Sequence, residues 1–153
     1  MLENIIEDRD FAKLMQKNIV EMVIHFFNKE QNFGILCKVD EVGFTPELPE
    51  YISSSLSPLT LFFLAGYTFE TARIEENYLV FEAGFGEDNF GSLVSVPLLS
   101  IMQIIVDETP LLINLATYQA QETPEVAEMS DEKGVADSMA SFLSNPENSK
   151  FLK

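Results

Sequence analysis

His25 and Cys37 are the side chains of this sequence best suited to covalent or acid–base chemistry. They are its only histidine and its only cysteine. A histidine base beside a cysteine thiol can activate a nucleophile. Both residues lie among apolar neighbours, however, and nothing in their spacing pairs them. Because buried thiols are usually inert, we expect no catalytic residue and no enzyme, with a Cys–His dyad as the open alternative.

The glycine-rich segment GFGEDNFG (84–91) could hold a cation through Glu87 and Asp88, or a phosphate through its glycines. A calcium loop needs regularly spaced oxygen ligands, and a phosphate loop precedes a helix and ends in a lysine. The segment has neither feature, so we expect a solvated turn, no metal site and no cofactor. Its glycines favour a bulge or the close approach of another backbone.

Binding is the remaining chemistry, and YLVFEAGF (78–85) is the segment best suited to it. Strand alternation places Leu79, Phe81, Ala83 and Phe85 on one side. A small residue among large ones leaves room for a ligand, and the main chain at a strand edge can bind an extended peptide. The alternative is that these side chains simply face the core.

A series of short strands must position that segment. Prolines make VGFTPELP (42–49) an edge strand or a turn, and the continuous apolar run LTLFFLA (59–65) predicts a buried strand. Such regular short spacing is typical of an antiparallel sheet or a small barrel in an α+β protein. The other predicted strands are GILCKVD (34–40), TFETARI (68–74), YLVFEAGF, SLVSV (92–96) and LLINLA (111–116).

Two helices complete the expected fold. The first spans residues 9–29, with Asp10 as its cap and apolar residues at a spacing of three or four. Its stripe is wider than a small sheet covers, so the helix is either enclosed in its own domain or meets a second subunit. The second helix, PLLSIMQIIVDE (97–108), is predicted because proline favours the first helical position.

Composition narrows the possible partners. The net charge of −16 leaves no basic footprint for nucleic acid and argues against an anionic membrane surface as a partner. The N-terminus MLENIIEDRD is charged from its third residue, so we expect no signal peptide. The longest apolar runs are shorter than the roughly 20 residues of a membrane span. A single cysteine fits a reducing cytoplasm.

The composition changes near Gln119. The following stretch is acidic and lacks aromatic residues, which is typical of a flexible segment. We therefore expect a domain over residues 1–118 and a flexible acidic tail over 119–153, which ends in Phe151, Leu152 and Lys153.

The stretch YLVFEAGFG followed by SLVSVPLLSIMQIIVDE (78–108) carries a resemblance. A helix, a strand like ILCKVD and a proline-containing segment like FTPELPEYI precede it, and a last strand and an acidic tail follow. In motif and order the chain resembles the stringent starvation protein B family over about residues 10–117. Gly84 stands where that family usually has an arginine, and Glu87 where a second glycine usually follows.

The resemblance implies a fold and a function. Members of this family are bacterial adaptors that bind ssrA-type degrons and deliver tagged proteins to the ClpXP protease. Their fold is a small Sm-like antiparallel β-barrel with a helix that forms a homodimer. By this resemblance, the peptide groove of this chain would use Ala83, Phe81, Phe85 and Ile113. The helix that forms the dimer would use Met15, Ile19, Met22 and Phe26. The contact with a ClpX-type unfoldase would be made by Phe151, Leu152 and Lys153.

A secretion-type chaperone is the rival interpretation. Such chaperones are also small, acidic, dimeric α+β proteins that hold unfolded effector segments. They match this chain in size and composition but share no ordered motif with it.

Overall fold

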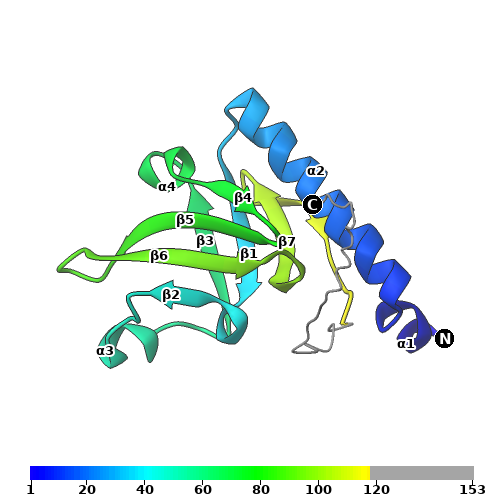
Figure 1. The fold of residues 1–153 in the computed structure, drawn as a ribbon, viewed down its shortest axis with the longest axis horizontal. Coiled ribbons are helices and arrows are strands. Elements are labelled where there is room, and N and C mark those ends of the chain that lie inside the picture. Colours follow the sequence, from blue (N-terminus) through cyan, green and yellow to red (C-terminus); the bar gives the residue numbers. More distant parts are fainter. Residues whose placement is uncertain (118–153) are drawn as a thin grey trace, which may run out of the picture. The chain divides into compact units, whose positions relative to one another are not determined.

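The chain folds as an α+β protein with two four-stranded antiparallel sheets and few helices (Figure 1). The computed structural model describes residues 1–117. Sheet A has the strand order β3-β1-β7-β8 and sheet B the order β2-β6-β5-β4, and among these residues no closed barrel forms. The elements are α1 (Leu2–Ile6), α2 (Arg9–Lys29), β1 (Phe33–Lys38), β2 (Gly43–Thr45), α3 (Glu50–Ser53), β3 (Leu59–Leu64), α4 (Tyr67–Glu70), β4 (Arg73–Glu75), β5 (Tyr78–Phe85), β6 (Phe90–Pro97), β7 (Ile101–Val106) and β8 (Thr109–Ile113).

Helix α2 confirms the predicted bounds but not the predicted cap. The carboxylate of Asp8 accepts a hydrogen bond from the Phe11 N–H at 2.8 Å, whereas Asp10 lies within the first turn. At the other end, Glu30 adopts a left-handed conformation with φ 54° and ends the helix. The cap therefore falls two residues earlier than predicted, because Arg9 and Asp10 are already helical.

One hydrophobic core joins α2 and both sheets. Sheet A supplies buried residues from β1, β3 and β7, and sheet B supplies them from β5 and β6. Helix α2 adds Ile19, Val23 and Phe26 to the same cluster. In Figure 1 the helix runs obliquely beside one end of the strands, away from the turn that joins β5 and β6. The open end between the sheets is thus closed by the helix.

The β5–β6 hairpin is the longest ladder of the fold. Its register runs without a shift from the pair Tyr78 and Pro97 to the pair Phe85 and Phe90. The turn between the strands needs a left-handed residue, which Gly86 supplies with φ 74°. The expected bulge is therefore absent from this ladder, and the hairpin extends as a regular two-stranded arm.

The predicted helix over residues 97–108 was wrong. Pro97 is the last residue of β6, a short 3₁₀ turn follows over Leu98–Ser100, and the remainder forms β7. A register shift opposite Leu36 and Cys37 places an extra residue in β7, so that Ile101 and Ile104 are both buried. This spacing of three imitates a helix, while the β-branched residues favour a strand.

The predicted strand over residues 68–74 was also wrong in its first half. After Gly66, with φ 60°, residues Tyr67–Glu70 form the single turn α4. The Thr68 hydroxyl accepts a hydrogen bond from the Ala65 N–H at 2.9 Å and donates to the Phe63 carbonyl at 2.7 Å. These local bonds compete with a strand ladder, so that only Arg73–Glu75 pairs with β5.

Strand β3 buries one face rather than two. Phe62 and Leu64 lie in the core, whereas Leu59, Leu61 and Phe63 are exposed. The short β2 at the edge of sheet B confirms the expected edge strand. No helix within residues 1–117 is both long and apolar enough to span a membrane. The predictions made for residues 119–153, which include Phe151, Leu152 and Lys153, lie outside the described residues.

The position of the α2 cap gives a direct test of this helix boundary. We expect Asp8→Ala to lower the free energy of unfolding by about 1 kcal/mol, because an orphan N–H loses its partner. Asp8→Asn should change little, since asparagine caps equally well, and Asp10→Ala should cost less than Asp8→Ala. Urea denaturation followed by circular dichroism measures all three. A larger loss for Asp10→Ala would contradict the boundary.

Candidate functional site

The two residues considered for covalent chemistry lie in very different environments. Cys37 is completely buried on β1, within the hydrophobic core, and burial raises the pKa of its thiol far above the usual range. His25 is exposed on α2, with its ring 5.8 Å from that of Phe26. A substrate in solvent cannot reach the Cys37 sulfur without opening the core. This geometry does not favour a Cys–His dyad.

A groove of about 770 Å³ opens over the β5–β6 hairpin. Its walls come from four elements that are distant in sequence: β2, the end of β3 with α4, β5 and β6. In Figure 1 the hairpin extends between α4 on one side and β2 with α3 on the other. The lining residues are Thr45, Ala65, Tyr67, Thr68, Glu82, Ala83, Gly84, Asn89, Gly91, Ser92 and Leu93.

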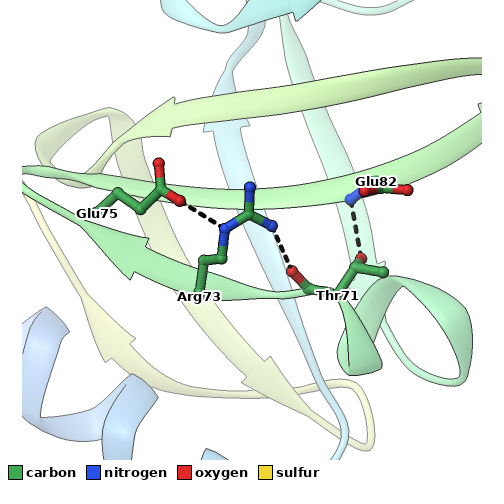
Figure 2. Close-up of polar contacts among 4 residues, drawn as sticks. All are labelled: Thr71, Arg73, Glu75 and Glu82. Carbon is green, nitrogen blue, oxygen red and sulfur yellow. Dashed lines mark hydrogen bonds and ion pairs between the residues drawn. The ribbon is translucent and has the colours of Figure 1, made fainter.

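One edge of β5 is open along this groove. Strand β4 pairs with β5 only from Tyr78 to Val80. Beyond that point the Glu82 N–H donates to the Thr71 hydroxyl oxygen at 2.9 Å, so this N–H points away from β6 (Figure 2). Alternate residues of a paired strand direct their polar groups to the same edge. The main-chain groups of Gly84 therefore face the same edge, past the last residue that β4 covers.

The floor of the groove lacks large side chains where β5 and β6 meet. Gly84 and Gly91 are directly opposite each other in the ladder. A Cβ atom on Gly84 would lie only 1.8 Å from the Asn89 side-chain oxygen, so Asn89 folds closely over this glycine. A Cβ atom on Gly91 would meet nothing within 4 Å. At Gly84 the absence of a side chain thus allows the close approach of Asn89. At Gly91 the absence of a side chain leaves free space.

The charge of the groove comes from Glu82. It is the one charged residue among those that line the groove, and no ion pair involves it within residues 1–117. The Tyr67 hydroxyl donates to its carboxylate at 2.5 Å. This hydrogen bond, together with the negative charge of Glu82, raises the pKa of Tyr67. The groove therefore presents a carboxylate that is held in place but not neutralised.

Arg73 is too strongly engaged elsewhere to neutralise Glu82. Its guanidinium Nε lies 2.6 Å from the Glu75 carboxylate, and its Nη1 donates to the Thr71 carbonyl at 2.9 Å. Figure 2 shows the Glu82 carboxylate extending away from this guanidinium. The Arg73 guanidinium is thus directed along β4 rather than into the groove.

The structure separates the four predicted peptide-binding residues. Ala83 lines the groove. Phe81 is fully buried in the core, and Phe85 is half-buried, with its ring 5.7 Å from that of Phe44. Ile113 lies on β8 in the other sheet, where it is exposed. Only one of the four residues therefore belongs to this groove, while the two phenylalanines support the strand that forms it.

The predicted dimer helix is largely covered by its own chain. Met15, Ile19 and Phe26 are buried, and Met22 is half-buried against the same core. The wide apolar stripe is thus explained by enclosure of the helix within its own domain. This was one of the two predicted alternatives, the other being contact with a second subunit. The large apolar residues that α2 leaves most exposed are Leu14 and Ile24.

The acidic turn was considered as a cation site. Glu87 and Asp88 lie in the loop between β5 and β6, beside a smaller pocket formed with α3. Within the described part of the chain, no three histidine, cysteine, aspartate or glutamate side chains gather as a metal site would require. The expectation that the protein uses no metal and no cofactor stays a prediction.

Sequence reasoning missed most of the groove. Glu82 alternates with Ala83 along the strand and was assigned to the opposite face, although both line the groove. Thr68 was placed in a strand over residues 68–74, whose first half the structure replaces by α4, and Tyr67 was assigned to no element. The useful signal was the pair Gly84 and Gly91, because two glycines that face each other across a hairpin leave the backbone accessible.

Comparisons of this chain with protein-family models, with curated proteins and with solved structures found no match.

The buried thiol predicts a specific pH dependence. A group whose pKa is higher in the folded state contributes its full stability below its unfolded pKa, about 8.5 for cysteine, and loses it as the pH rises further. Relative to Cys37→Ala, the wild-type free energy of unfolding should therefore fall by about 1.4 kcal/mol per pH unit above that value.

Urea denaturation at several alkaline pH values measures this difference. The Cys37→Ala variant is the control, because other groups titrate equally in both proteins. Parallel stability profiles would show that the folded protein ionises the thiol as easily as the unfolded chain does. The buried position of Cys37 would then be wrong, and the dyad would return as a serious alternative.

Proposed function

We propose that this protein is a non-enzymatic adaptor that binds an unstructured degron peptide in the groove over the β5–β6 hairpin. The observation that supports this most is the open β5 edge at Gly84, which lies within a groove whose floor has no large side chains. An extended peptide can pair with such an edge and place alternate side chains in the adjoining pocket. The fully buried Cys37 argues against a cysteine-based enzyme.

The proposed peptide lies between α4 and the hairpin. Its main chain would use the polar groups of Gly84, since the Glu82 N–H already donates to Thr71, and its side chains would enter the space beside Ala83 and above Gly91. Main-chain pairing gives affinity that depends little on sequence, while the pocket selects side chains. A peptide without secondary structure is therefore the class of ligand that fits best.

Glu82 makes this groove selective for charge. A carboxylate of the ligand placed beside Glu82 would be repelled, whereas a lysine, an arginine or a neutral residue would not. Gly84 occupies the position where the resembling family usually has an arginine, so the positive charge of that family's strand is absent here, and the Asn89 side chain lies over the position instead. The preferred degron is thus one that keeps its acidic residues away from β5.

Delivery is the second part of the proposal. The tail, residues 119–153, would contact a ClpX-type unfoldase through Phe151, Leu152 and Lys153 in the cytoplasm. Linking two weak contacts in one molecule raises the effective concentration of cargo at the protease. The protein would act as a homodimer without nucleic acid, membrane or cofactor, and its two sheets would be an open relative of the Sm-like barrel.

A labelled ssrA-type peptide tests the binding site directly. We expect saturable binding by fluorescence anisotropy, and Ala83→Gln should weaken it at least tenfold, or about 1.4 kcal/mol, because the larger side chain fills the groove. Leu14→Gln is the control, since Leu14 is exposed on α2, outside the groove. Equal loss in both variants would reject this site, and no binding by the wild type would reject ssrA-type cargo.

Removal of residues 119–153 separates the adaptor from the rival chaperone. The truncated protein should bind the peptide as tightly as the full chain but should no longer stimulate degradation of a tagged protein by ClpXP, because the tether is lost. A chaperone whose function lies wholly in the folded domain would be unaffected. Stimulation that survives the truncation would therefore contradict delivery through the tail.

A further inference from the structure

The outer face of sheet A carries apolar residues on all four strands, together with the polar residues Lys38 and Gln103. In the β1–β3 ladder, Leu36 is opposite Leu61 and Gly34 is opposite Phe63. A Cβ atom on Gly34 would approach the side chains of Leu61 and Phe63 to 3.2 and 3.5 Å, so both side chains lean over this glycine on the same face. We call this surface the outer face of sheet A and define it by Leu36, Leu59, Leu61, Phe63, Ile105 and Ile113.

The same face continues onto β7 and β8. Gly34 is opposite Ile105 in the β1–β7 ladder, and Gln103 is opposite Ile113 in the β7–β8 ladder. The outward residues of β1 and β3 thus form rows with those of β7 and β8. Gln103 interrupts one of these rows, and the apolar surface is continuous through the other, in which Ile105 is opposite Pro110.

Several of these side chains are largely exposed to solvent. Phe63 is 66% exposed, Ile113 56%, Leu59 47% and Leu61 40%. Together the six residues present on the order of 500 Å² of apolar surface, at the upper end of what one patch on a monomer shows. A stable interface buries about 800 Å² per partner, its polar rim included. The face is thus large enough to form the centre of such an interface.

The charge of the protein makes this face the best place for a second copy. Two chains with a net charge of −16 repel each other over most of their surface. The strand positions that make up the outer face of sheet A include Lys38, opposite Leu59, but no carboxylate. Copies that meet through this face bury apolar area and keep their carboxylates at the rim, where water screens them.

From this geometry we infer that the protein forms a homodimer in which the outer faces of sheet A from two copies pack against each other. A two-fold axis brings the same patch of each chain together, and two twisted sheets stack readily at about 10 Å. The inference rests on the homodimer of the proposed function but not on peptide binding. It assigns the contact to sheet A rather than to α2.

Sedimentation equilibrium of the full chain and two variants tests this assignment. Phe63→Glu adds a charge at the most exposed of these positions, and Ile24→Glu adds the same charge at a 43% exposed position on α2. We expect the wild type and Ile24→Glu to have twice the mass of the chain, and Phe63→Glu to have the mass of one chain. Circular dichroism checks that each variant is folded, and Phe63→Ser replaces Phe63→Glu if the latter does not fold.

Each other result would overturn the assignment. A dimer that survives in folded Phe63→Glu would remove sheet A from the interface, and loss of the dimer in folded Ile24→Glu would place the interface on α2. A monomeric wild type would reject the second copy and leave this face to a different partner. The peptide titration is independent of all three outcomes, because it reports on the groove of a single chain.

Discussion

The rest of the fold depends on the face-to-face packing of the two sheets, and the contact between Phe62 and Phe81 is part of that packing. Phe62 belongs to β3 in sheet A and Phe81 to β5 in sheet B, and their rings pack edge to face with centroids 5.7 Å apart. Both side chains are buried within the core that α2 covers from one end. By packing face to face, the two open four-stranded sheets each bury one face in this shared core.

That contact also determines what is left exposed. Because side chains alternate along a strand, the burial of Phe81 places Glu82 on the opposite side of β5, where the Tyr67 hydroxyl binds its carboxylate. In the same way, the burial of Phe62 places Leu61 and Phe63 on the outer face of sheet A. The groove and the apolar face are thus two consequences of one pair of packed strands.

Sequence patterns predicted the secondary structure correctly in segments whose apolar residues follow one regular spacing, either that of a helix or that of a strand. The helix over residues 9–29 and the strands β1, β5 and β6 followed their apolar spacing closely. The pattern failed at residues 97–108, because an extra residue in β7 gave a strand the spacing of a helix. It also failed at α4, where bonds made by the Thr68 hydroxyl replaced a ladder.

The candidate site was predictable only in part, for a related physical reason. Ala83 stood out because a small residue among large ones is visible in the sequence. The partners that complete the groove come from segments far away in the chain, such as Thr45 and Tyr67. The open edge beside these residues depends on where β4 stops pairing with β5. No local sequence pattern encodes the length of that ladder. The wide stripe on α2 left enclosure and dimerisation equally open, and only packing shows that its own core covers it.

Amide chemical shifts of the ¹⁵N-labelled protein, followed while an ssrA-type peptide is added, would locate the bound peptide on the structure. We expect the largest changes on Glu82, Gly84 and Gly91, with none on the β8 residue Ile113. Changes centred on β8 or on α2, with the β5–β6 hairpin unaffected, would contradict a peptide site at the open edge of β5.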